Sequence, residues 1–182
     1  MPDAGWEKDV LGFWFSELTP EQWYKKDDDV DATIVERFGA LHDAVAGTDN
    51  ARLQESRDTV LAAIIVLDQF ARNMFRGSAK SFAGDGKARA LSNAALEAGF
   101  DASMNDDEKQ FLYMPFMHSE TLADQNRSVA LFEALGKEES AKYAQLHRDP
   151  IRLFGQFPHR NAMLGRPTSP AEQAWIDEHG GF

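Results

Sequence analysis

The sequence predicts an all-α protein of about eight helices, stacked as antiparallel pairs in a helical repeat array. Apolar residues recur at steps of three and four along nearly the whole chain, and no Val/Thr-rich alternating stretch flanked by tight turns is present. Residues that begin and end helices fall between these periodic stretches. The connections between them are short, which is typical of helices that pack against their sequence neighbours.

The first half of the chain opens with a helix predicted from about Ala4 to Phe15. The string TPEQW then offers Thr19 as an N-cap, with Pro20 at the first helical position. Longer helices are predicted over Asp28–Ala46, Ala51–Phe75 and Lys87–Ala98. They are followed by Gly47, Gly77 and Gly99, each of which can adopt the left-handed conformation that ends a helix.

The second half contains the clearest local signal, the string SPAE near the C-terminus. Ser169 can cap a helix there, Pro170 suits its first turn, and Glu172 can reach back to the cap, while Gly180 ends it. The preceding helices are predicted over Asp106–Met117, Glu120–Leu135 and Glu138–Phe157. Pro115 and Pro150 lie inside two of them, where each removes a backbone donor and favours a kink.

The size and charge of the chain limit its function. A length of 182 residues suits one domain spanning residues 1–182. A net charge of -11 disfavours nucleic acids and acidic membranes as partners. The absence of cysteine excludes disulfides and thiolate nucleophiles. The apolar runs are too short to span a bilayer and no secretion signal is recognisable, so we expect a cytoplasmic protein.

A first polar motif, LDQFARNMFRG, covers residues 67–77. Asp68 and Arg72 continue the apolar stripe of their helix at a spacing of four, and Asn73 and Arg76 lie on the adjacent line. Two interpretations remain open. Asp68 and Arg72 form a buried clasp that fixes helix register, or Arg72 and Arg76 present planar donor groups to a carboxylate or phosphate ligand.

A second motif, FGQFPHRNAMLGR at residues 154–166, repeats the order Gln-Phe, Arg-Asn, Gly/Arg. Just before it, His147 falls on the helical line of Tyr143, Ile151 and Phe154 and should face inward. Pro158 should end the helix. We therefore expect a loop on which side chains can converge on a ligand, carrying His159, Arg160 and Asn161, with Arg166 beyond it.

Positive charge is concentrated around both motifs. Residues 148–166 contain four arginines and one aspartate, and residues 68–89 contain five basic residues and two aspartates, so each segment has a net charge of +3. Such segregation in an acidic chain favours an anion site, although a solvated helix face also explains a run of charge.

A third motif, FLYMPFMHSETLADQ, places His118 and Glu120 after an apolar run. Together with His147 and His159 they contain the groups for general acid–base catalysis, although a histidine behind so many apolar residues is also a common core residue. Metal-ligand spacing is lacking, as are a nucleophile elbow, a phosphate-binding loop and a dinucleotide fingerprint. We expect neither a metal nor a cofactor.

These three motifs, with the early strings VLGFWF and WYKKDDDVDATIVERF, resemble the bacterial family known as domain of unknown function 924. The resemblance spans nearly the whole chain. It implies a tetratricopeptide-like all-helical fold, in agreement with the predicted helices, and it implies no established activity.

The leading functional hypothesis is a protein that binds a small anionic molecule in a pocket, with hydrolase-like acid–base chemistry as an extension. The alternative is an interaction module whose helical array binds a protein or peptide partner. The sequence does not indicate the oligomeric state. Candidate ligand-binding residues are Asp68, Arg72, Asn73, Arg76, Arg160, Asn161 and Arg166, and catalytic candidates are His118, Glu120, His147 and His159.

Overall fold

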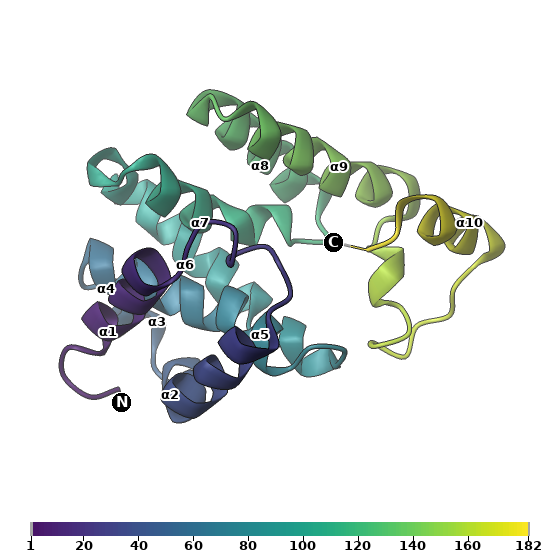
Figure 1. The fold of residues 1–182 in the computed structure, drawn as a ribbon. Coiled ribbons are helices and arrows are strands. Elements are labelled where there is room, and N and C mark those ends of the chain that lie inside the picture. Colours follow the sequence, from purple (N-terminus) through teal and green to yellow (C-terminus); the bar gives the residue numbers. More distant parts are fainter. Residues whose placement is uncertain (1, 182) are drawn as a thin grey trace. The chain divides into compact units, whose positions relative to one another are not determined.

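The computed structural model describes residues 2–181, and in that range the chain forms helices and turns without any strand (Figure 1). The all-α prediction is confirmed. No helix within the described range is long and apolar enough to cross a membrane.

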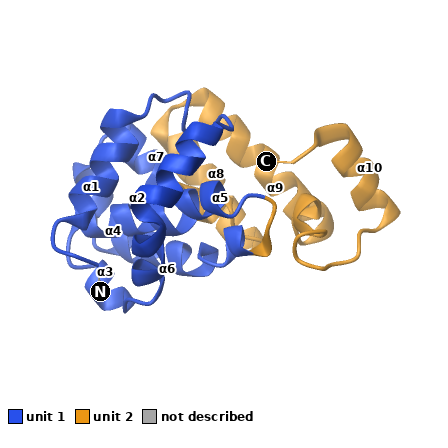
Figure 2. Cartoon of the chain, turned by 60° about the horizontal axis from the view of Figure 1, so that its bottom comes forward, with its two compact units in different colours: residues 1–76, 80–112 blue, residues 77–79, 113–182 orange. Residues whose placement is uncertain are grey.

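The chain divides into two compact units, shown in different colours in Figure 2. Unit 1 comprises residues 1–76 and 80–112, and unit 2 comprises residues 77–79 and 113–182. Helix α7 (Asp106–Met117) belongs to both, because its residues from Tyr113 onward are part of unit 2. That residues 1–182 behave as one domain stays a prediction, which a single cooperative unfolding transition would support.

Unit 1 is formed by helices from the first two thirds of the chain. Two of them continue without a break into wider π-helical turns: α1 into Phe13–Glu17 and α4 into Ile65–Phe70. Besides the start of α7, the helices are α1 (Trp6–Gly12), α2 (Asp28–Ala46), α3 (Asn50–Leu53), α4 (Arg57–Ile64), α5 (Ala71–Met74) and α6 (Asp85–Glu97).

The prediction of one continuous helix over Ala51–Phe75 is wrong. Ser56 has an extended backbone, with φ of -147° and ψ of 162°, and its side chain accepts a hydrogen bond from the Thr59 backbone N–H at 3.1 Å. Serine is a preferred N-cap because its hydroxyl satisfies a backbone donor that the first helical turn leaves open. The chain therefore ends α3 at Leu53 and begins a separate helix at Arg57.

Three smaller expectations for unit 1 are also corrected. The first helix begins at Trp6 rather than Ala4, and the string TPEQW forms turns only, joined by hydrogen bonds between Thr19 and Gln22. Gly47 is not left-handed, since its φ is -85°. Lys87 satisfies the end of α2 instead, because its Nζ donates to the carbonyl oxygens of Val45, Ala46 and Thr48.

Aromatic rings fill the core of unit 1. Phe13, Phe38 and Phe70 contact one another, with ring centroids between 4.9 and 5.9 Å apart. Trp14 packs between Phe70 and Phe111 at 5.6 and 5.4 Å. This cluster joins α1, α2, the π-helical turn after α4, and α7, so the segment that carries the first polar motif is anchored by large buried side chains.

In unit 2, α8 (Leu122–Leu135) and α9 (Glu138–Phe154) run side by side, and α10 (Pro170–His179) follows a short 3-10 turn at Pro158–Arg160 (Figure 1). The predicted ends are corrected at two places. α8 begins two residues after Glu120, and α9 ends three residues before Phe157, because Gly155 adopts a left-handed φ of 73°. The capping box predicted at Ser169 and Glu172 is confirmed.

The segment after Pro158, predicted as a loop on which side chains converge on a ligand, forms a short 3-10 turn that is largely buried. Phe157 and Asn161 are 0% exposed and Arg160 is 6% exposed. The segment therefore contributes to the core of unit 2, and truncating Arg160 would disturb packing as well as charge.

Candidate functional site

In unit 1, Asp68 and Arg72 form the clasp that one of the two interpretations predicted. Nη1 of Arg72 donates to the backbone oxygen of Asp68 at 2.7 Å and to its Oδ1 at 3.1 Å. Arg72 also donates to both carboxylate oxygens of Asp85, at 2.9 and 3.1 Å. Burial lowers the pKa of Arg72, but the charges of Asp68 and Asp85 more than offset this, so the net pKa is raised.

The two polar residues on the adjacent helical line of the first motif also bind a carboxylate. Arg76 binds Asp31 of α2 with two hydrogen bonds, from Nε to Oδ2 at 3.0 Å and from Nη2 to Oδ1 at 2.9 Å. Asn73 donates to the same carboxylate at 2.7 Å. The donor groups of both arginines in this motif are therefore directed at carboxylates of their own unit, which leaves them little capacity for an anionic ligand.

In unit 2, Glu120 and Arg166 form the corresponding clasp across 46 residues of sequence. Arg166 donates to the two carboxylate oxygens of Glu120 at 2.8 and 2.9 Å. The backbone N–H of Phe157 donates to Glu120 at 2.7 Å, and Arg166 also donates to the Phe157 carbonyl at 3.2 Å. Burial raises the pKa of Glu120, but the hydrogen bonds from Arg166 and the Phe157 N–H lower it by more, so the net pKa is lowered. This carboxylate is therefore ionised and already hydrogen-bonded.

Asn161 joins this clasp to the start of α10. Its side-chain oxygen accepts from Nε of Arg166 at 3.0 Å, and its Nδ2 donates to Glu172 at 3.2 Å. Glu172 also accepts from Gln156 at 2.7 Å and from the backbone N–H of Ser169 at 2.8 Å. The Ser169 N–H and the Gln156 amide lower the pKa of Glu172 to about 2. These bonds fix the chain between α9 and α10.

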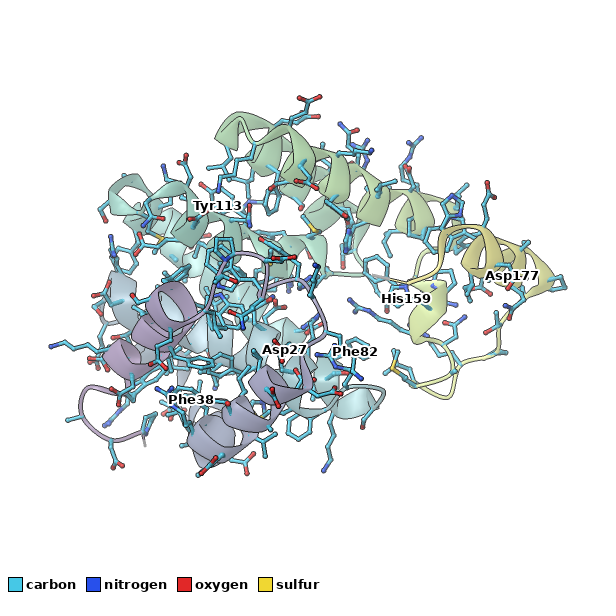
Figure 3. The ribbon with its side chains drawn as sticks, in the orientation of Figure 1. Asp27, Phe38, Phe82, Tyr113, His159 and Asp177 are labelled. Atoms are coloured by element: carbon cyan, nitrogen blue, oxygen red, sulfur yellow. The ribbon has the colours of Figure 1, made fainter. Side chains whose placement is uncertain are left out.

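The remaining candidates of unit 2 lie around the ring of Phe157 or next to a residue that contacts it. We call His118, His147, His159 and Arg160 the histidine cluster. The Arg160 guanidinium lies 4.4 Å from the centroid of the Phe157 ring, and the rings of His147 and His159 lie 5.9 and 5.5 Å from it. His118 and His147 are 6.1 Å apart. Figure 3 shows His159 on the turn that follows α9.

His147 is buried and neutral at the centre of this cluster. Its Nδ1 lies 2.8 Å from the Tyr143 carbonyl oxygen and donates to it, which assigns the Nδ1–H tautomer. Burial lowers the pKa of His147 to about 3, and the positive charges of His118, Arg160 and His159 contribute to this shift. The prediction that His147 faces inward is confirmed, while Tyr143 on the same helical line is half exposed.

The structure thus brings together seven of the predicted site residues in unit 2 and places four in unit 1. Within residues 2–181, no three histidine or acidic side chains are arranged to hold a metal ion. Sequence reasoning missed the partners Asp31, Asp85 and Glu172, and the central Phe157. Asp31 lies 42 residues from Asn73, and no local pattern in the sequence links them. The unit 2 members are His118, Glu120, His147, His159, Arg160, Asn161 and Arg166, and the unit 1 members are Asp68, Arg72, Asn73 and Arg76.

Comparison with known proteins identifies relatives without an assigned activity. A family model described as "Bacterial protein of unknown function (DUF924)" matches residues 10–180. A solved structure, that of the protein of unknown function ATU0120 from Agrobacterium tumefaciens, is 36% identical to this chain, with a TM-score of 0.91. That match covers 96% of this chain and 98% of the other. None of the curated proteins matches the chain.

Proposed function

Because the chain belongs to the DUF924 family, which carries no assigned activity, we propose a function from the geometry of unit 2: binding of a small anion at the histidine cluster. The ligand class is a phosphate, sulfate or carboxylate group. One observation carries the proposal, namely that His147, His159 and Arg160 surround one aromatic ring, that of Phe157, with His118 next to His147.

The electrostatics of the cluster support an anion. Burial is the main cause of the lowered pKa of His147, and the positive charges of His118, Arg160 and His159 lower it further. The same charges would attract an anion. Glu120, the nearby carboxylate, is engaged by Arg166 and the Phe157 N–H. A bound anion would interact favourably with Arg160 and with any protonated histidine, in surroundings where burial strengthens each charge–charge contact.

The surroundings of the arginines reduce the number of residues that are candidates for binding the anion. Arg72, Arg76 and Arg166 direct their donors at carboxylates. Arg160 is stacked on Phe157 beside the histidines, and its charge also acts on Glu120. Acid–base chemistry on the bound anion falls to His118 and His159, which are half-buried, since His147 stays unprotonated near neutral pH.

The experiment is a thermal-unfolding titration with phosphate, sulfate and acetate, each compared with chloride at equal ionic strength. A specific anion should raise the melting temperature in proportion to the logarithm of its concentration above its Kd, reaching about 2.7 kcal/mol of stabilisation at a hundredfold excess. NMR titration of His147 supplies a second measurement, because a bound anion should raise the pKa of this histidine.

Variants test whether the anion binds at the histidine cluster or acts through the general charge of the protein. His159→Gln and Arg160→Lys keep size and polarity and should remove most of the anion-specific shift in melting temperature. Lys142→Ala, which removes an exposed cation on α9, should leave this shift unchanged. A wild type that shows no anion-specific shift and an unaltered His147 pKa would show that the proposal is wrong.

A further inference from the structure

A groove between α9 and α10 lies outside the histidine cluster. Its volume is about 570 Å³, which is within the range of grooves that bind ligands. Both helices belong to unit 2. Leu146, Leu153 and Trp175 give it apolar walls, and Asp149, Arg152 and Glu178 stand around them.

The apolar part of the groove is built on helical spacing. Leu146 and Leu153 are seven residues apart on α9, so they lie on one face two turns apart. Leu153 is 66% exposed, the highest value among the large apolar side chains of the described chain. Trp175 is 9% exposed, and His179 stacks on it at 4.7 Å with an angle of 11° between the rings, which holds the indole in place.

The charged residues of the groove are available to a partner. Asp149 and Glu178 are exposed and form no hydrogen bond or ion pair through their carboxylates with any residue in the range 2–181. The edge of the groove has two carboxylates and one cation, Arg152, so its net charge is negative. Charged groups around an apolar centre favour a partner of opposite charge and increase its rate of association.

We propose that this groove binds a basic amphipathic helical segment of another protein. Such a segment places apolar side chains at positions i, i+3, i+4 and i+7 against Leu146, Leu153 and Trp175, with lysine or arginine beside Asp149 and Glu178. A second copy of the chain fits this surface less well, because copies with a net charge of -11 repel one another. The interaction is independent of the anion site.

The test uses the full chain and a fluorescein-labelled synthetic peptide of about 18 residues, long enough to form a marginal helix. The peptide carries leucine at i, i+3, i+4 and i+7 and lysine on both flanks. Two matched peptides serve as comparisons, one with a scrambled order and one with glutamate in place of each lysine. Fluorescence anisotropy should show binding of the lysine peptide and at least about tenfold weaker binding of the other two.

Variants of the exposed groove residues then assign the site. Leu153→Glu should weaken binding by about tenfold to a hundredfold, the equivalent of losing one buried leucine side chain. Asp149→Asn combined with Glu178→Gln should weaken it by about twofold to fivefold and reduce its salt dependence. Leu122→Glu is the matched control, since Leu122 is a 44% exposed leucine of the same unit outside the groove.

Several outcomes would overturn the proposal. They are equal binding of the scrambled peptide, tighter binding of the glutamate peptide, and an equal loss of affinity in the Leu122→Glu variant. Sedimentation that shows a wild-type dimer abolished by Leu153→Glu would assign the groove to a second copy of the chain instead. Circular dichroism of each variant, matching the wild type, ensures that a loss of binding reports on the groove.

Discussion

The segments 67–77 and 154–166 share the order Gln-Phe, Arg-Asn, Gly/Arg, yet the structure uses them differently. In unit 1 the arginines bind aspartates from α2, α6 and their own helix. In unit 2, Arg166 binds a glutamate in the same manner, but Arg160 lies over an aromatic ring beside three histidines. The comparison teaches that an arginine motif predicts an anion site only after its carboxylate partners have been found.

The same comparison explains why the sequence left two interpretations open. Positive charge is concentrated to the same extent around both segments, with a net charge of +3 over residues 68–89 and over residues 148–166. The carboxylates that neutralise much of it, Asp31 and Glu120, lie outside both segments, and folding brings them in from 45 and 46 residues away. Formal charge along the chain therefore overstates the capacity of these arginines for a ligand.

The largest expected effect concerns the clasp of unit 1. Asp68 is 0% exposed and accepts from Arg72 and from the Gln69 amide, so Asp68→Ala removes a buried carboxylate that binds both side chains. We expect a loss of about 3 to 5 kcal/mol in the free energy of unfolding, measured from urea midpoints. Glu17→Ala is the control. It breaks the more exposed pair with Arg37 and should shift the urea midpoint much less than Asp68→Ala does. Equal losses would contradict the buried clasp.

The second effect concerns His147 and its pH dependence. Its pKa is about 3 in the folded protein and about 6.5 when exposed in the unfolded chain, so the unfolded state binds the proton first. The stabilisation is fully present above pH 6.5 and is lost as the pH falls toward 3. Between pH 6.5 and 5, where most carboxylates stay ionised, the loss should reach about 2 kcal/mol.

His147→Asn removes this titrating group while keeping a donor for the Tyr143 carbonyl. The variant should therefore lose stability less steeply than the wild type over the same pH interval, as followed by chemical unfolding at each pH. Gln145→Asn, at an exposed position of the same helix, removes no titrating group and should leave the steepness unchanged. Parallel pH profiles of wild type and His147→Asn would be inconsistent with a neutral, buried His147.

The smallest effect concerns the clasp of unit 2. The side chains of Glu120 and Arg166 are 28% and 24% exposed, so solvent weakens their attraction relative to the Asp68 clasp. A double-mutant cycle with Glu120→Gln and Arg166→Met should give a coupling energy of about 1 to 2 kcal/mol. A coupling near zero would place this pair with ordinary surface ion pairs, and one above that of Asp68 and Arg72 would reverse the order of the two clasps.

The sequence by itself determined the features that depend on neighbouring residues. The bounds Asp28–Ala46 and Asp106–Met117 agree with the structure, as does the capping box of Ser169 and Glu172. Apolar spacing and caps act within about one turn of helix, so both can be recognised along the chain. The same local reasoning failed at Ser56, because continued apolar periodicity concealed the break between α3 and α4.

Only the tertiary structure decided which polar groups meet. The sequence predicted that Arg72, Arg76, Arg160 and Arg166 are important. It did not indicate which carboxylates bind the first two and Arg166, or that Arg160 stacks on Phe157. Nor did it indicate the groove between α9 and α10, whose walls come from residues 146–153 and 175–179. Contacts of this kind depend on how helices distant in sequence pack against one another, because the energy that selects a partner is the burial and pairing of groups that no local pattern links.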